Sequence, residues 1–284
     1  MIPDARVAHA DARRQHNPKG GVLLGGVSPL GRERISFGAP CGANRLMTER
    51  LLMVTEHTVR SFTSELKKLD SSIEEMGRLV ISQIGGAMQA IARRDPAMAE
   101  AVVRNDKAVD DLEHEVDSLT VRLLALRQPV ALDLRVIVAA LRVSIDLERI
   151  ADYAANIAKR VQDLNQVPIQ EPIGTIIRMG EWAQEMLEDV VRAYLARDAE
   201  LAEQVWHRDD EMDRLYTKLL CSLRNLMTED SHAITPCSHL LLVAKCLERM
   251  GDHITNIAEH IQFLVRGTCR HQLAARGNIE CPGV

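Results

Sequence analysis

The hydrophobic and polar positions between His57 and Arg266 follow the three-to-four-residue spacing of amphipathic α-helices. Few prolines interrupt this stretch, and each of them can stand at the start of a helix or in a linker. The prolines and turn signals divide the chain into six predicted helices, at residues 57–94, 96–127, 129–165, 172–196, 199–228 and 236–266.

A typical predicted helix has about 30 residues, which corresponds to a rod about 45 Å long. A rod of this length buries its apolar stripe only by packing along neighbouring helices. Aspartates precede two of the helices, Asp95 before Pro96 and Asp198 before Ala199, and we expect both to be N-caps. The pattern therefore predicts an all-α protein of six long antiparallel helices.

The first 52 residues lack this periodicity. Four of the ten prolines and seven of the sixteen glycines fall in the first 42 residues, and such a composition is typical of irregular segments. We expect residues 1–52 to be a disordered, glycine-rich leader, with Met47 and Met53 as candidate true start residues. Residues 267–284 are expected to form a flexible tail.

The third and sixth predicted helices share a sequence motif. Residues 147–152 read LERIAD and residues 247–252 read LERMGD, and Asn-Ile-Ala follows at 156–158 and at 256–258. Asp106 and Asp110 match Asp209 and Asp213 at an offset of 103 rather than 100, so a three-residue insertion falls near residues 128–134. The sequence therefore predicts a tandem repeat of two three-helix bundles, in residues 53–168 and 169–266.

Composition narrows the class of protein. The chain is 46% hydrophobic and 26% charged, with 3 Phe, 3 Tyr and 2 Trp, which argues against disorder, an all-β fold and base-stacking surfaces. The net charge of −5 argues against a nucleic-acid partner and favours a cationic one. The longest uncharged run, residues 79–92, is too short to span a bilayer. The six cysteines form no C-x-x-C pair, and we expect scattered reduced thiols.

Acidic residues recur at the spacing that places two of them on one helix face. Glu148 and Asp152 are four residues apart, as are Glu248 and Asp252, and small residues flank both pairs. Carboxylate oxygens favour hard cations such as Mg²⁺, Mn²⁺, Ca²⁺ or iron. The candidate metal ligands are Asp106, Asp110, Glu148, Asp152, Asp209, Asp213, Glu248 and Asp252, with Glu113, Asp117, Asn156 and Asn256 as further candidates.

Other interpretations of this pattern stay open. Acidic pairs on a helix are often only solvated, and a metal-free helical scaffold predicts no tightly bound ion. A di-iron carboxylate oxidase is the enzymatic alternative, but it needs Glu-x-x-His on two helices, and the only such pair here is Glu229 and His232, in a predicted turn. The histidines, His253 included, are expected at the surface or at caps. Recurrence of the acids in both repeats favours a metal site, and the lack of a second Glu-x-x-His pair leads us to expect no enzymatic activity.

The two L-E-R-[IM]-[AG]-D-x-x-x-N-I-A stretches, together with R-Q-P-V-A-L-D-L-R at residues 127–135, resemble the PhoU family of phosphate-transport accessory and phosphate-signalling proteins. The resemblance covers residues 53–266. It implies tandem three-helix bundles in which the eight candidate ligands bind metal clusters, with iron, manganese, magnesium or zinc as the ion. Position 151 is Ala where the family usually has Gly, which slightly narrows the space beside the acidic pair Glu148 and Asp152.

The resemblance also implies a function and partners. PhoU-family proteins are cytoplasmic and contact both the ATPase of the phosphate ABC transporter and the PAS region of a sensor histidine kinase. We therefore expect a cytoplasmic negative regulator of phosphate uptake and phosphate-regulon signalling. It is expected to be a homodimer that reaches the membrane only through its partners.

Overall fold

The computed structural model describes residues 42–164 and 171–267. Most of the predicted leader and nearly all of the predicted tail lie outside these ranges. The chain divides into two units, residues 1–50 and 51–284. The helices from residue 51 onward pack together within the second unit.

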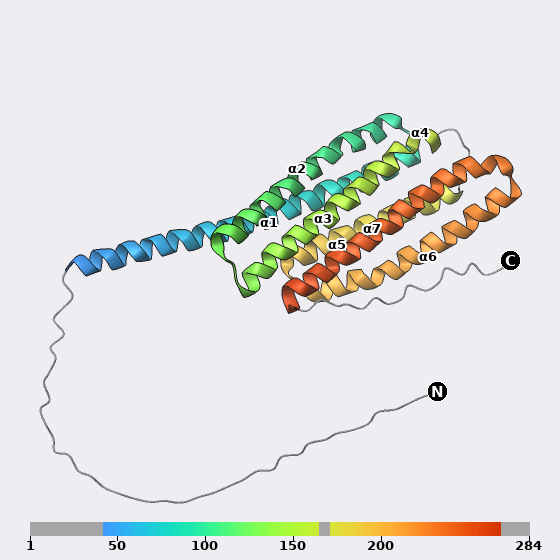
Figure 1. Ribbon diagram of the computed structural model, residues 1–284. Helices are drawn as coiled ribbons and strands as arrows, with labels where there is room; N and C mark the ends of the chain where they lie inside the picture. Colours follow the sequence, from blue (N-terminus) through green and yellow to red (C-terminus); the bar gives the residue numbers. More distant parts are fainter. Residues whose placement is uncertain (1–41, 165–170, 268–284) are drawn as a thin grey trace, which may run out of the picture. The chain divides into compact units, whose positions relative to one another are not determined.

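All described elements are helical (Figure 1). In chain order they are α1 (Gly42–Arg93), α2 (Pro96–Arg127), α3 (Ala131–Lys159), α4 (Val161–Leu164), α5 (Glu171–Ala196), α6 (Ala199–Glu229), the 3-10 helix η1 (Ser231–Ala233) and α7 (Ile234–Arg266). The predicted all-α class is confirmed. The six predicted helices correspond to α1, α2, α3, α5, α6 and α7.

Two helix boundaries differ from the prediction. α1 begins at Gly42 rather than at residue 57, so it extends into the segment predicted to be a disordered leader. All four prolines of that segment precede Gly42, so none of them interrupts the helix. The predicted third helix is interrupted at Arg160, where α3 ends and the short α4 follows. Neither glycine nor proline stands near Arg160, so the sequence gives no local signal for this break.

The turns between the first two helices of each repeat are built alike. Arg94 and Arg197 adopt left-handed backbone conformations, with φ of 52° and 55°. The side chains of the next residues, Asp95 and Asp198, each accept hydrogen bonds from two backbone N–H groups in the first turn of the following helix. Both N-cap predictions are confirmed, and the two repeats share this turn geometry.

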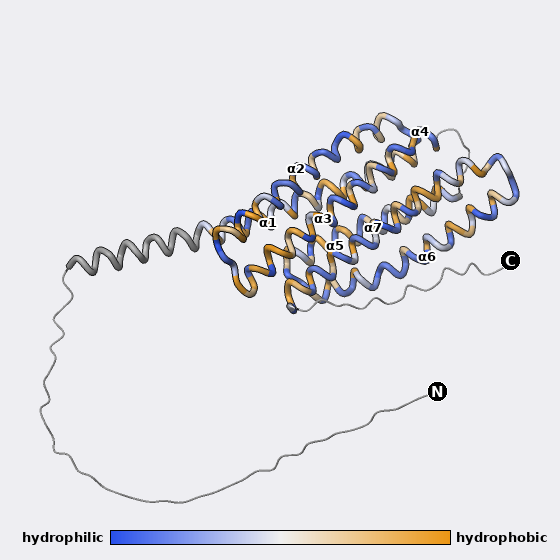
Figure 2. Tube along the Cα trace, in the orientation of Figure 1, coloured by the Kyte–Doolittle hydropathy of each residue, from blue (hydrophilic) through white to orange (hydrophobic). Residues whose placement is uncertain are grey.

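The long helices pack around a continuous apolar core. α5, α6 and α7 contact one another, as do α2 and α3, and Gly86 of α1 lies against Val102 of α2. Figure 2 shows hydrophobic and hydrophilic positions alternating along each of these helices. The two bundles meet where α3 lies along α7. They meet again where Gln184 Nε2 of α5 donates a 3.0 Å hydrogen bond to the carbonyl oxygen of Ile81 on α1.

None of the helices that the structure describes has a stretch long and apolar enough to cross a membrane. Among the described cysteines, Cys237 and Cys246 are free thiols, whereas Cys221 is in a disulfide. The expectation of reduced thiols throughout is therefore wrong at Cys221. Sequence spacing alone does not reveal which cysteines the fold brings together.

Candidate metal centre

The first repeat brings acidic side chains of two helices into one electrostatic cluster. Burial raises the pKa of Asp106 on α2 to about 6, and the charges of Asp110 and Asp152 add to this effect. Burial also raises the pKa of Glu148 on α3, with contributions from Asp152, Asp110 and Glu113. Carboxylates from α2 and α3 therefore face a common region and repel one another. The four predicted ligands of this repeat, and Glu113, are therefore near enough to influence one another electrostatically.

A carboxylate oxygen in this cluster is buried without a hydrogen-bond partner. This atom is Asp106 Oδ1, and both polar atoms of the Gln83 amide on α1 are also buried and unpartnered. Gln83 is close enough to lower the pKa of Asp106 but is not in hydrogen-bond geometry with it. An unsatisfied buried polar group costs about 1–3 kcal/mol. A cation held by Asp106 would satisfy this oxygen, so the residues present fit a hard metal ion.

The second repeat places an equivalent aspartate against the backbone of the neighbouring helix. Asp209 of α6 is buried, and a Cβ added to Gly251 of α7 would lie 2.5 Å from Asp209 Oδ1. The absence of a side chain at position 251 therefore permits this close approach. Ala151 and Asp106 hold the matching positions in the first repeat.

A basic side chain stands beside the acidic pair of α3. Arg149 Nε lies 3.4 Å from Glu148 Oε2, and its Nη1 lies 3.4 Å from Asp152 Oδ2. Within residues 42–164 and 171–267, no three acidic, histidine or cysteine side chains converge closely enough to hold a metal ion as placed. Metal binding in the first repeat would therefore require Arg149 to move and the carboxylates to turn toward each other.

The acidic pair of α7 has two basic neighbours rather than one. Lys245 Nζ donates a 2.6 Å hydrogen bond to Glu248 Oε2, and Arg249 Nη1 lies 3.6 Å from Asp252 Oδ2. Asp213 of α6 is partly buried, and it takes part in an interaction of its own. The acidic pair of α7 therefore contacts one more basic side chain of its own helix than the pair of α3 does.

Of the four further candidate ligands, only one adjoins a cluster. The charge of Glu113 contributes to the raised pKa of Glu148. Asp117 is exposed on α2, and the exposed Asn156 accepts a hydrogen bond from its own helix. Asn256 Nδ2 lies 3.4 Å from Asp146 Oδ1, away from the acidic pair of α7. Asp117, Asn156 and Asn256 each lie one helical turn beyond the nearest clustered acid, and their side chains do not join the clusters.

A buried acid with two histidines joins the bundles, and the sequence analysis missed it. Asp146 of α3 is 7% exposed, and its carboxylate lies 2.8 Å from His253 Nδ1 and 3.1 Å from His260 Nε2 of α7. Burial raises the pKa of Asp146, but the histidine contacts outweigh it and the net pKa is lowered. The expectation that His253 lies at the surface or at a cap is wrong. A signal existed, because Asp146 stands in the apolar stripe between Val143 and Ile150.

Equivalent positions of the two repeats meet at this contact. Tyr153 and His253 are 100 positions apart, as the repeats are, and their rings lie 5.8 Å apart between centroids. The position matching Asp146 is Cys246, whose pKa is raised by burial and lowered less strongly by Arg160. The α3–α7 contact therefore has the arrangement expected around a local two-fold axis.

The predicted Glu-x-x-His pair lies outside the bundle interior. Glu229 ends α6 and His232 lies in η1, and both side chains are exposed. A di-iron carboxylate site needs such pairs to project inward from two helices. This pair does not have the placement that the oxidase alternative requires.

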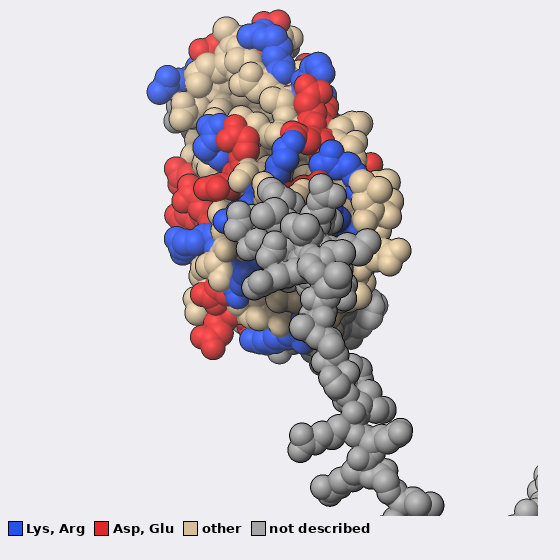
Figure 3. All heavy atoms as spheres, turned by 90° about the vertical axis from the view of Figure 1, so that its left-hand side faces the viewer, with Lys and Arg blue, Asp and Glu red and all other residues tan. Residues whose placement is uncertain are grey.

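Charges of both signs are mixed on the face shown in Figure 3. Where described residues form that face, blue Lys and Arg side chains are interspersed with red Asp and Glu side chains. A nucleic-acid interface needs a basic stripe or field. The visible described surface of this face has no such field.

Comparison with known proteins agrees with the repeat. A family model described as the PhoU domain matches residues 73–161 and again residues 176–261, one match in each repeat. The chain belongs to the PhoU family. The expected resemblance and the tandem architecture are thereby confirmed.

Similar proteins share the PhoU architecture over most of their length. The chain is 46% identical over 215 residues to a phosphate-specific transport system accessory protein PhoU homolog of Caulobacter vibrioides, covering 75% of this chain and 94% of that relative. A homolog with the same description from Xylella fastidiosa is 42% identical, covering 74% and 89%.

Solved PhoU structures have the same fold. The crystal structure of PhoU from Pseudomonas aeruginosa matches with a TM-score of 0.71 and 36% identity, covering 73% of this chain and 100% of that one. The phosphate transport system regulatory protein PhoU from Streptococcus pneumoniae matches with a TM-score of 0.70 and 30% identity, covering 74% and 100%.

Proposed function

We propose that this PhoU-family protein is a non-enzymatic negative regulator of phosphate uptake and phosphate-regulon signalling. In this proposal it is a cytoplasmic homodimer that binds metal and acts as an adaptor. Its partners are the ATPase of the phosphate ABC transporter and a phosphate sensor histidine kinase. The observation that carries the proposal is the 46% identity, across both repeats, to a phosphate-specific transport system accessory protein.

The metal-binding part of the proposal is supported by the first acidic cluster. Its carboxylates come from two helices, and one of its oxygens is buried and unpartnered, at Asp106. A hard cation suits ligands that are all oxygen atoms. Iron, manganese, magnesium or zinc would be held in the first repeat by Asp106, Asp110, Glu148 and Asp152, and in the second by Asp209, Asp213, Glu248 and Asp252.

A bound cation would supply charge neutralisation rather than catalysis. Without it, burial raises the pKa of Asp106 and of Glu148, and the charges of neighbouring carboxylates on α2 and α3 add to this effect. Neutralising them would bring the two helices closer along this face and give it a defined shape. We infer that the metal prepares the acidic face for a partner protein.

Deletion of the gene tests the regulatory role. Phosphate uptake and alkaline phosphatase activity should rise in phosphate-rich medium, because the restraint on the transporter and on the kinase is lost. Complementation with the intact gene should restore the wild-type level. Unchanged uptake and phosphatase activity in the deletion strain would contradict the proposed function.

Substitution of the acidic pairs tests the metal role separately. The variant E148A/D152A/E248A/D252A should lose bound iron or manganese by elemental analysis and keep its helical circular dichroism spectrum, because these acids border the core. A matched control replaces four exposed acids outside the candidate set, Glu74, Glu100, Asp111 and Glu229, with alanine. Equal metal content in the two variants would refute the ligand assignment, and metal-free wild-type protein after loading would support the scaffold alternative.

A further inference from the structure

The connection between α2 and α3 exposes many large apolar side chains. Eleven large hydrophobic side chains are exposed among the described residues, and six of them fall between positions 121 and 134. In Figure 2 the ends of α2 and α3 on either side of this connection carry orange positions, whereas the short link between them is hydrophilic. Concentrated apolar exposure on a folded protein marks an interaction site. The six residues, here called the apolar turn, are Val121, Leu124, Leu126, Val130, Leu132 and Leu134.

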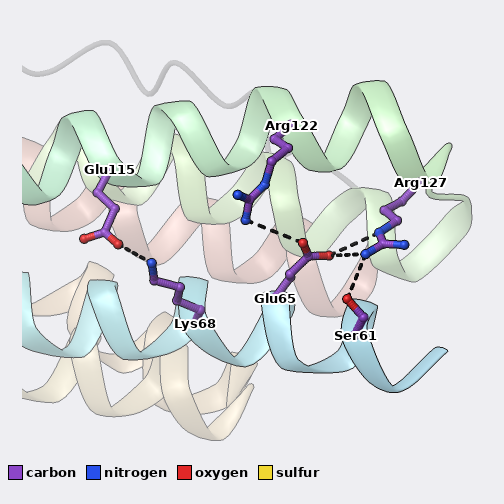
Figure 4. Close-up of polar contacts among 6 residues, drawn as sticks. All are labelled: Ser61, Glu65, Lys68, Glu115, Arg122 and Arg127. Carbon is purple, nitrogen blue, oxygen red and sulfur yellow. Dashed lines mark hydrogen bonds and ion pairs between the residues drawn. The ribbon is translucent and has the colours of Figure 1, made fainter. Parts of the chain in front are cut away.

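A polar network fastens the apolar turn to α1 (Figure 4). Arg127 donates hydrogen bonds of 3.1 and 2.9 Å to Glu65 Oε2 and one of 2.9 Å to Ser61 Oγ. Arg122 donates a longer hydrogen bond of 3.5 Å to the other oxygen of Glu65. Glu65 therefore holds the last turn of α2 from two sides. The apolar side chains project from a fixed support, which lowers the entropy lost when a partner binds.

Two residues of the connection that carries the apolar turn have left-handed backbone conformations, which are unfavourable for residues other than glycine. Gln128 and Ala131 have φ of 46° and 48°, in the left-handed region. Val130 is the N-cap residue of α3 but makes no side-chain capping hydrogen bond. Such conformations cost of order 1 kcal/mol each and persist where the surroundings or the function require them.

The matching turn of the second repeat is polar. Residues 228–232, between α6 and α7, read TEDSH, and all five are exposed. Asp230 accepts a 2.8 Å hydrogen bond from the backbone of His232, and Ile234 is the nearest exposed large apolar residue. The same helix connection is therefore closed without an apolar surface, so the fold does not require the apolar turn of the first repeat.

The charges in the apolar turn indicate the chemistry of its partner. Residues 121–135 include three arginines, one aspartate and no lysine, in a chain whose net charge is −5. Arg127 and Arg122 both pair with Glu65, but the Arg122 side chain is 56% exposed whereas that of Arg127 is 23% exposed. A partner surface with an apolar centre and carboxylates at its rim would complement both features.

Two other occupants fit these charges less well. An anionic membrane surface is usually bound by clusters of four or more Lys or Arg residues, and one exposed arginine falls short of that. A second copy of the chain, packed turn against turn around a two-fold axis, would place Arg122 near its own symmetry mate. A different protein that supplies carboxylates avoids both difficulties.

We propose that the apolar turn is a docking surface for a protein partner whose apolar patch is rimmed by carboxylates. This inference rests on the proposed function, in which the partner is the ATPase of the phosphate transporter. Leu126 and Val130 supply the apolar contact, and Arg122 supplies a charge that selects the partner.

The test measures binding of the full-length protein to the purified transporter ATPase. L126S/V130S should weaken binding about tenfold or more, because central apolar contacts dominate interface energies. R122Q should weaken it less, and the difference from wild type should shrink at high salt. The control I234S/L242S changes two exposed apolar residues of α7 and should bind as wild type does. Thermal melts of each variant should match wild type, because all the substituted side chains are largely exposed.

Each outcome of this test has a distinct meaning. Wild-type binding that is unchanged by L126S/V130S would overturn the docking surface and leave the proposed function standing. Absence of wild-type binding to the ATPase would count against the proposed function itself. If L126S/V130S instead dissociates a dimer in light scattering, or loses binding to phosphatidylglycerol vesicles, the occupant is a second copy or a membrane and the proposal is wrong.

Discussion

The acidic clusters of the two repeats stand on equivalent helices but differ in the charges around them. In the first repeat a single basic side chain of α3, Arg149, approaches both carboxylates, whereas in the second Lys245 and Arg249 each pair with one. The first repeat also has Glu113 where the second has Tyr216, and Lys245 lies 5.6 Å from the centre of that ring. The acidic pair of α3 therefore has one basic neighbour and that of α7 has two, although Lys159 of α3 also acts on Asp106.

The connections between the last two helices of each repeat also differ, in the polarity of their exposed side chains. One exposes aliphatic side chains and the other exposes polar ones, although both join equivalent helices. Duplication thus preserved the positions of the acids along the helices and left their surroundings free to diverge. We expect the two repeats to differ in metal affinity and in partner contacts, while the turns capped by Asp95 and Asp198 remain alike.

The largest expected effect is on metal binding by the separate repeats. E148A/D152A should lower manganese affinity about tenfold or more, whereas E248A/D252A should lower it only a few-fold, because the basic neighbours on α7 already offset the charge there. Titration calorimetry of metal-free protein measures both values. Equal losses in the two variants would remove the proposed difference between the repeats.

The buried acid between the bundles should have the next largest effect. D146N should lower the free energy of unfolding by about 2–4 kcal/mol, because His253 and His260 lose their charged partner at a site with little solvent. Urea denaturation measures this change. C246S, at the matching position of the second repeat, should cost about 1 kcal/mol or less; a larger loss there would show that the two sides of the contact are equally important.

The same substitution has a defined pH dependence. The folded-state pKa of Asp146 lies below its usual value of about 3.9. Its stabilisation is therefore present above that pH and is lost as the pH falls through the folded-state pKa. The stability difference between wild type and D146N should be constant above about pH 4 and shrink below it. A difference that changes mainly between pH 5 and 8 would assign the dependence to the histidines instead.

A smaller effect, of opposite sign, is expected at Asp106. Its pKa is raised to about 6, so ionisation destabilises the metal-free fold as the pH rises from about 4 through 6. D106N should stabilise metal-free protein at pH 7 by about 1–2 kcal/mol after allowance for solvent screening. The exposed control D117N should change little. Added manganese should stabilise wild type more than D106N, and the absence of that reversal would contradict a ligand role for Asp106.

The smallest effect is expected at the caps, where the repeats should not differ. D95A and D198A should each lower stability by about 1 kcal/mol, because both carboxylates accept equivalent hydrogen bonds. Thermal melts of the two variants provide the comparison. A clearly smaller loss for D198A would show that the pairing of Arg197 with Asp70, at 2.7 and 2.9 Å, supports the second turn independently.

The features that the sequence could predict are those set by local chemistry. Asp95 and Asp198 identify helix starts because a cap requires only its own next few residues. The spacing of Glu148 and Asp152 places both on one helix face for the same reason. The sequence around Arg160 contains no glycine or proline, so it does not predict the break between α3 and α4.

The sequence did not predict which side chains meet between helices. Spacing along α2 does not show that Asp106 becomes buried, nor that Arg149 stands beside the acids of α3, because both depend on how the two helices are rotated against each other. The cluster at Asp146 was predictable in part, since an acid in an apolar stripe needs a buried partner. Its partners lie on α7, more than a hundred residues later.

Tyr153 and His253 hold the same place in the two repeats and touch each other. In a homodimer of half-length chains such a contact would join two identical residues, and every mutation would appear on both sides at once. Because the two repeats lie in one chain, the two sides of the contact can carry different residues. A carboxylate, Asp146, stands against imidazoles on one side of the axis and a thiol, Cys246, holds the matching position, so no second buried acid has to be accommodated there.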